Sequence, residues 1–161
     1  MNQLIDPQTI APPYRHRYSH AFVVPAEARL LISSGTVGVD PEGGVPADFG
    51  RQVELVMVNL SEILQSAGMG WDDVVKFTGY LKPQCDMATF AEIRHRYFGS
   101  IKPAMTLVWV AGLVDARWML EVEIMAARRE HLTSGHRPHP PAAAAAEAGL
   151  LNPSRSMELK P

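Results

Sequence analysis

The clearest strand pattern in the chain is TLVWVAGLVDARWMLEVEIMAA, residues Thr106 to Ala127. Residues 106–111 are apolar on both sides of a strand, and residues 118–127 alternate as a strand with two different faces does. Residues 114–117, VDAR, provide the turn between them. The sequence therefore predicts a sheet that includes the strands 106–111 and 118–127.

Two helices are predicted upstream of these strands. Asp48 is a suitable N-cap for an amphipathic helix, and Gly68 can end that helix in the left-handed conformation that helix C-termini favour. Asp86 can cap a second helix, which ends at Gly99. Residues 75–81, between the two helices, alternate as a strand.

A hairpin is predicted before the first helix. Residues 21–24 and 30–32 are short apolar runs, and the connection 25–28 between them begins with a proline. The complete order is then ββαβαββ. This order predicts an α+β fold with a single layer of sheet and two helices on one of its faces.

Two helices can cover only one face of such a sheet. Leu107, Trp109 and Met125 are expected on the other face, and large apolar side chains are poorly placed against water. We therefore expect another chain to cover this face, so the sequence predicts an oligomer.

The composition limits the possible functions. The 161 residues carry a net charge of -2 at pH 7, which argues against a protein that binds nucleic acid through a basic surface. Cys85 is the only cysteine, so no intrachain disulfide can form. Neither a secretory signal nor an apolar run long enough to span a membrane is expected, which favours a cytoplasmic protein. The histidines form no metal motif, and Gly35 and Gly38 form no dinucleotide loop, so neither a metal nor a cofactor is expected.

Six short stretches resemble, in the same order, the RidA/YjgF family of the enamine/imine deaminase superfamily. They are YSHA at 18–21, ISSGTVGVDPEG at 32–43, NLSEILQSAG at 59–68, DVVK at 73–76, PAMT at 103–106 and LEVEIMA at 120–126. The resemblance implies a chorismate-mutase-like homotrimer with three clefts between subunits. It also implies that a small enamine or imine is hydrolysed to a keto acid and ammonia without a cofactor.

The chain is accordingly divided into three parts. Residues 1–17 are an N-terminal extension, residues 18–130 are the RidA-like domain, and residues 131–161 are interpreted as a flexible tail rich in proline and alanine.

Met105 departs from the family pattern. The resemblance implies an arginine after Pro-Ala, which grips the carboxylate of the substrate, and a thioether cannot replace the charge-assisted hydrogen bonds of a guanidinium. Met105 is then a wall of the substrate pocket, or a plain strand residue, and the specificity is expected to be altered. Lys102, Arg15 and Arg17 are candidates to supply the missing positive charge.

Glu121 matches the acidic residue that, in the family, positions or activates the attacking water. Imine hydrolysis needs such a group, because water must lose a proton and the leaving nitrogen must gain one. Glu123 lies two residues further along the strand and shares the same face. The alternative is that both carboxylates only form salt bridges at a subunit interface.

Four further residues are candidates for binding the substrate. Tyr18 matches a tyrosine of the family's cleft, and Ser34 and Gly35 lie where the first hairpin is expected to meet that cleft. Trp109 is included as a possible platform for the ligand. Each has a structural alternative: a packed aromatic residue for Tyr18, a turn for Ser34 and Gly35, and the core or an interface for Trp109.

Three functions remain open on this basis. The first is a cofactor-free hydrolase or deaminase acting on an enamine, an imine or a related C=N compound, for example of the 2-aminomuconate type. The second is a trimeric module that binds a small metabolite or a protein without chemistry. The third and weakest is a ribonuclease-like translation inhibitor, as reported in the family. Small-molecule substrate and self-association are the partners expected, with neither nucleic acid nor membrane.

Overall fold

The structure is a computed structural model that describes residues 2–129, so the predicted tail lies outside the described residues. In chain order the elements are β1 (Gln3–Ile5), the 3-10 helix η1 (Tyr14–His16), β2 (Ala21–Val23), β3 (Ala28–Ile32), β4 (Thr36–Val37), α1 (Phe49–Ser66), the 3-10 helix η2 (Trp71–Asp73), β5 (Val74–Leu81), α2 (Met87–Phe98), β6 (Ala104–Trp109) and β7 (Leu120–Arg129).

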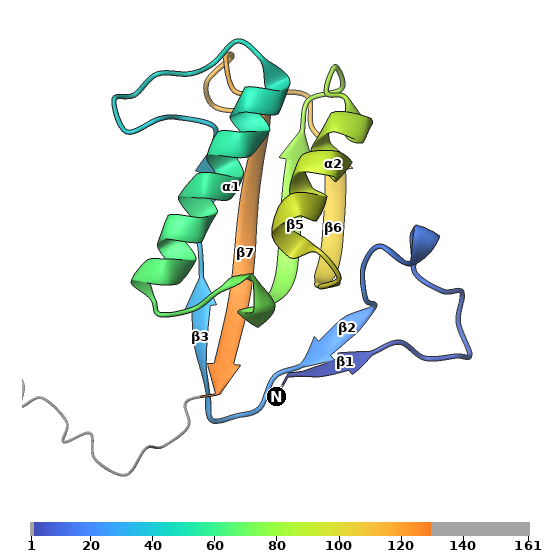
Figure 1. The fold of residues 1–161 in the computed structure, drawn as a ribbon. Helices are drawn as coiled ribbons and strands as arrows, with labels where there is room; N and C mark the ends of the chain where they lie inside the picture. Colours follow the sequence, from blue (N-terminus) through green and yellow to red (C-terminus); the bar gives the residue numbers. More distant parts are fainter. Residues whose placement is uncertain (1, 130–161) are drawn as a thin grey trace, which may run out of the picture. The chain divides into compact units, whose positions relative to one another are not determined.

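The main sheet is mixed, and β7 lies at its centre. Its strand order is β3–β7–β5–β6, and β4 also pairs with β7. Among the strands that the structure describes, only β5 and β6 pair in parallel, and α2 provides the crossover that a parallel pair requires. Figure 1 shows α1 and α2 side by side on one face of this sheet. The predicted α+β fold with two helices on one face is therefore confirmed.

The predicted helix ends are also confirmed. The side chains of Asp48 and Asp86 accept hydrogen bonds from backbone N–H groups in the first turns of α1 and α2. Gly68 and Gly99 follow the two helices with φ of 65° and 54°, a conformation that residues with a Cβ rarely adopt. Local capping chemistry thus sets the length of both helices.

The predicted hairpin between residues 21–24 and 30–32 is wrong. β2 pairs with β1 in a separate two-stranded sheet, whereas β3 pairs with β7, from Ala28 opposite Arg129 to Ile32 opposite Met125. Alternation identifies a strand but does not identify its partner. Every residue of β3 is paired with a residue of the long central strand β7. The short strand β2 is paired with β1 instead.

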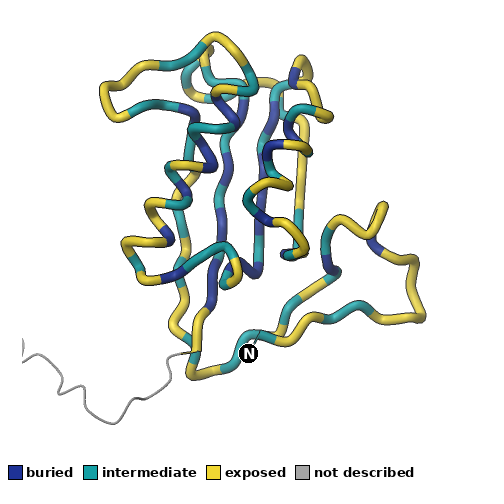
Figure 2. The backbone as a smooth tube through the Cα atoms, in the orientation of Figure 1, coloured by how far each residue is buried: buried dark blue, intermediate teal, exposed yellow. Residues whose placement is uncertain are grey.

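The core lies between the helices and the sheet. Figure 2 shows the buried segments running along β5 and β7 and along the sides of the helices that face them. Phe77 of β5 packs its ring edge-on against Phe98 of α2, with the centroids 5.6 Å apart. The fully buried positions include Val56, Leu60, Leu64, Leu81, Leu120, Val122 and Ile124.

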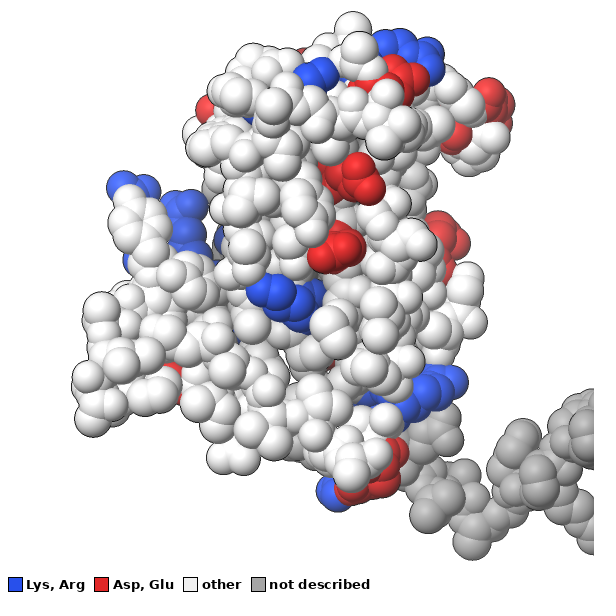
Figure 3. All heavy atoms as spheres, turned by 180° about the vertical axis from the view of Figure 1, so that it is seen from behind, with Lys and Arg blue, Asp and Glu red and all other residues white. Residues whose placement is uncertain are grey.

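The opposite face of the sheet, here called the open face, is not covered by any helix of residues 2–129. The residues whose register places them on it are Leu30, Ile32, Lys76, Thr78, Tyr80, Thr106, Val108, Glu121, Glu123 and Met125. Ile32 is 69% exposed and Leu30 is 46% exposed. Figure 3 looks onto this face and shows that most of it is uncharged, with a few acidic and basic groups.

The predicted sharing of this face by Leu107, Trp109 and Met125 is wrong. Met125 lies on the open face, but Trp109 is paired with Leu81, a core residue that points toward the helices. Leu107, two residues before Trp109, points to the same side. The alternation within a strand does not say which of its faces matches which face of a neighbouring strand.

Candidate functional site

Glu121 is half-buried on the open face, in the central strand of the sheet. Strand pairing sets it opposite Val37 of β4 and Tyr80 of β5. The segment before β4 is hydrogen-bonded to β7, the strand that carries Glu121, because the backbone N–H of Ser33 donates to the carbonyl of Ile124 over 3.0 Å. In return, the N–H of Ile124 donates to the hydroxyl of Ser33 over 2.9 Å. Sheet hydrogen bonds therefore fix the surroundings of Glu121.

Gly35 lies directly against the carboxylate of Glu121. A Cβ at position 35 would overlap Oε1 of Glu121, so the site requires glycine if the carboxylate is to stay where it is. Ser34, the neighbour of Gly35, is exposed to solvent. Three predicted site residues, Ser34, Gly35 and Glu121, thus lie together, and we call them the Glu121 group.

The two carboxylates of the open face differ in their partners. The hydroxyl of Tyr80 donates to Oε1 of Glu123 over 3.2 Å. Burial and then the charge of Glu123 raise the pKa of Tyr80 above its ordinary value. Within residues 2–129, no hydrogen bond or ion pair reaches the carboxylate of Glu121. Glu121 therefore has both oxygens available to a water molecule, whereas Glu123 is already engaged.

Tyr18 and Met105 lie elsewhere, in a cleft of about 440 Å³ between α2 and the edge strand β6, here called the Met105 cleft. Ser19 holds Tyr18 at the start of β6: it forms a parallel bridge with Ala104, and its N–H donates to the carbonyl of Pro103 over 3.3 Å. The site residues proposed from the sequence thus fall into two groups on opposite sides of the sheet.

Residues 9–128 match the family model described as Endoribonuclease L-PSP, which is most of the chain. The chain belongs to the RidA/YjgF/L-PSP family.

Relatives of this RidA/YjgF/L-PSP chain include archaeal and mammalian proteins. It is 38% identical over 109 residues to a RutC family protein of Pyrococcus abyssi, which covers 66% of this chain and 80% of that protein. It is 34% identical to the 2-iminobutanoate/2-iminopropanoate deaminase of Rattus norvegicus, over 78% of this chain and 90% of the rat protein. The crystal structure of the Rid family protein YyfB from Yersinia pestis superposes with a TM-score of 0.68 at 28% identity, covering 78% of this chain and 97% of that one.

Arg94 is the residue of this RidA/YjgF/L-PSP chain that sequence reasoning missed. Its Nη1 donates to the sulfur of Met105 over 3.1 Å, so a guanidinium from α2 reaches the position where the resemblance implies an arginine on the sheet. The available signal was its spacing: Arg94 follows Phe90 by four residues, on the face of α2 that packs against the core.

The other three basic residues proposed to replace the missing arginine line the same cleft as Met105 or the cleft next to it. Arg17 lines the Met105 cleft together with Arg94, and both also line an adjoining cleft of about 900 Å³. Arg15 and Lys102 line only the adjoining cleft.

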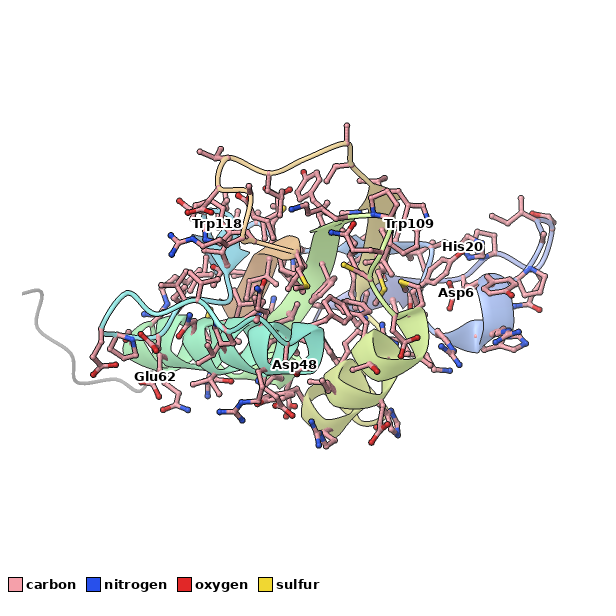
Figure 4. All side chains as sticks on the ribbon, turned by 90° about the horizontal axis from the view of Figure 1, so that it is seen from above. Asp6, His20, Asp48, Glu62, Trp109 and Trp118 are labelled. Carbon is pink, nitrogen blue, oxygen red and sulfur yellow. The ribbon has the colours of Figure 1, made fainter. Side chains whose placement is uncertain are left out.

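Trp109 does not line the Met105 cleft. It is 53% exposed and lines a smaller hollow of about 210 Å³ with Leu81 and Met87. Figure 4 shows it at the sheet edge, above the end of α2. A role in binding the same ligand as Tyr18 and Met105 is therefore not supported within a single chain.

No group of three or more His, Cys, Asp or Glu side chains in residues 2–129 is arranged to hold a metal ion. The helices described in this range are also too short or too polar to cross a membrane.

Proposed function

We propose that this protein is a cofactor-free hydrolase that releases ammonia from a small imine or enamine. The observation that carries the proposal is the carboxylate of Glu121, which stands against Gly35 without a partner of its own in the described chain. Relatives named as 2-iminobutanoate/2-iminopropanoate deaminases support the reaction type.

Glu121 would move the protons that this reaction requires. The imine reacts as its protonated form, the iminium ion, which an enamine reaches by taking up a proton on carbon. Water adds to the carbon of the C=N bond while the carboxylate accepts one of its protons, which gives a neutral carbinolamine. The same proton then passes to the nitrogen, the C–N bond breaks as ammonia leaves, and the carboxylate takes the proton of the remaining hydroxyl, so that a ketone or keto acid is formed.

A second copy of the chain would complete the site. In one protomer, the Glu121 group and the Met105 cleft lie on opposite sides of the sheet, so a single small substrate cannot contact both. The exposed Leu30, Ile32 and Val108 on the open face support its burial by another copy. We propose a homotrimer in which the Glu121 group of one subunit meets the cleft of the next, at three intersubunit sites.

The specificity would differ from that of relatives with an arginine at position 105. The Met105 thioether cannot bind a carboxylate, so the substrate holds its acid elsewhere or lacks an acid next to the C=N bond. A 2-aminomuconate-type dienamine, which carries a second carboxylate at the far end of its chain, is one candidate.

A non-catalytic binding module is the second candidate, and the replacement at Met105 favours it. A turnover assay separates the two. Imines with and without a carboxylate are generated in situ, and the rate of ammonia release with the protein is compared with the uncatalysed rate. Acceleration for at least one imine supports the hydrolase, and ligand binding without acceleration for the whole panel favours the binding module. Cleavage of single-stranded RNA in place of imines would instead favour the ribonuclease alternative.

A further inference from the structure

Arg94 is half-buried and has no counter-ion among residues 2–129. Its Nε is buried and lacks a hydrogen-bond partner, and its Nη1 contacts only the weak acceptor Sδ of Met105. The guanidinium carbon lies 6.0 Å from the centre of the Phe98 ring. Within residues 2–129, no carboxylate forms an ion pair with Arg94.

Arg96, two residues further along α2, provides a contrast. It is exposed and forms an ion pair with Glu54, as a surface arginine commonly does. In the described part of the chain Arg94 has no comparable partner, although a charge that is partly removed from water needs one more than an exposed charge does. Burial, together with the neighbouring charge of Arg17, lowers the pKa of Arg94 below its ordinary value. The protein thus keeps a guanidinium in a place that disfavours its charge, and a bound anion would offset this cost.

The surroundings of Arg94 suit a small organic anion. Arg94 and Arg17 line the Met105 cleft, whose volume of about 440 Å³ lies within the range of small-molecule sites, roughly 300–1,000 Å³. Tyr18 of the same cleft offers a phenol for a further hydrogen bond. The only acidic residue along the two connected clefts, among those the structure describes, is Glu92, which is exposed and lines only the larger one.

We propose that Arg94 and Arg17 form a carboxylate-binding subsite in the Met105 cleft. This inference rests on the proposed function and defines its substrate class. The guanidinium of Arg94 contacts the end of the Met105 side chain, so a bound carboxylate is held away from the backbone of β6, toward α2. The substrate is therefore an imine or enamine with a second carboxylate, separated from the C=N carbon by several bonds.

Two keto acids of equal length test this subsite. The first is 2-oxoadipate, which ends in a carboxylate, and the second is 2-oxohexanoate, which ends in a methyl group. Binding of each to the intact protein is measured by calorimetry at fixed pH and salt. The wild type is expected to bind 2-oxoadipate about 10- to 100-fold more tightly, as one or two charge-assisted hydrogen bonds would give.

Three variants show which residues cause the preference for 2-oxoadipate over 2-oxohexanoate. Arg94→Gln is expected to abolish it, and Arg17→Gln, on an exposed side chain that the fold does not need, is expected to reduce it. Arg96→Gln is the matched control on the same helix and should retain the full preference. Equal binding of the two acids by the wild type, or an unchanged preference in both Arg94→Gln and Arg17→Gln, would overturn the subsite.

The result is independent of turnover. An Arg94-dependent preference in a protein that hydrolyses no imine keeps the subsite and removes the proposed hydrolase. Imine hydrolysis without any preference for the distal carboxylate keeps the hydrolase and removes the subsite.

Discussion

The Glu121 group and the Met105 cleft are held by different means. Hydrogen bonds between the backbones of β4, β5 and β7 fix the surroundings of Glu121, and Gly35 leaves the space that its carboxylate occupies. The Met105 cleft depends on side chains from α2 and on an N-terminal segment joined to β6 by a bridge at Ser19. In the proposed enzyme, the group that transfers protons is therefore positioned by the backbone of the sheet. The groups that recognise the substrate are a few side chains, which substitutions can alter without changing the sheet.

Among the variants that compare the two sites, Gly35→Ala is expected to have the largest effect on turnover. The added methyl group displaces the end of the Glu121 side chain, which is flexible, so the thermal stability should change little. Turnover should fall by about 10²–10⁴, because a displaced general base is equivalent to a missing one. Ammonia release and thermal unfolding are measured together.

Gly112→Ala is the control for this variant, because a Cβ there meets no atom within 4 Å. A Gly35→Ala protein as active as Gly112→Ala would show that the contact between Gly35 and Glu121 has no part in the reaction.

A smaller effect is expected at position 105. With 2-aminoacrylate, generated from serine, the wild type should be weakly active or inactive, because no guanidinium stands on β6 to bind its carboxylate. The double variant Arg94→Gln/Met105→Arg moves the positive charge from α2 to β6 without crowding two guanidinium groups. Its activity on 2-aminoacrylate should rise about tenfold or more, equivalent to about 1.5–3 kcal/mol for a charge-assisted hydrogen bond. Wild-type turnover equal to that of an arginine-bearing relative would contradict this account of Met105.

The smallest effect concerns the N-terminal segment that carries Arg17 and Tyr18. The carboxylate of Asp6 accepts a hydrogen bond from the backbone N–H of His20 over 2.7 Å and contacts Nδ1 of the same residue at 2.9 Å. Figure 4 shows the two residues side by side. The hydrogen bond from the His20 backbone is the main cause that lowers the pKa of Asp6 from its ordinary value of 3.8.

Because this pKa is lower in the folded chain, the stabilisation is present above pH 3.8 and is lost as the pH falls through the folded-state value. The protection of the His20 and Ala21 amides from exchange, relative to their intrinsic rates at each pH, should fall in that range, while the protection of β7 stays high. Asp6→Asn should remove the pH dependence. An equal loss of protection in β7 would mean that the N-terminal segment and the central strand do not differ in local stability.

Local signals in the sequence were sufficient for the helices and the central strands. Asp48, Asp86, Gly68 and Gly99 act through their own neighbours, so their roles could be predicted before any tertiary contact was known. Strands were also predicted at β2, β3, β5, β6 and β7, although β6 and β7 are shifted by two residues from the expected ranges, whereas β1 and β4 were not predicted.

Pairing and register could not be predicted in the same way. The partner of β2, and the side of the sheet to which Trp109 points, depend on which strands meet and in which alignment. The proximity of Gly35 and Glu121, and that of Arg94 and Met105, arises from the same long-range pairing. Resemblance to a family indicated the first pair, but Arg94 matches no motif of that resemblance and became visible only in the structure.

The central claim is that Glu121, and not its neighbour Glu123, transfers the proton. Glu121→Gln keeps the size of the side chain and its ability to form hydrogen bonds, but it cannot carry a proton. Turnover of the best imine should fall by about 10²–10⁴ in Glu121→Gln, while the oligomeric state and the affinity for the keto acid product stay nearly unchanged. Glu123→Gln, in which the amide can still accept the hydrogen bond of Tyr80, should lose much less. Equal losses in the two variants, or unchanged turnover in Glu121→Gln, would contradict the account.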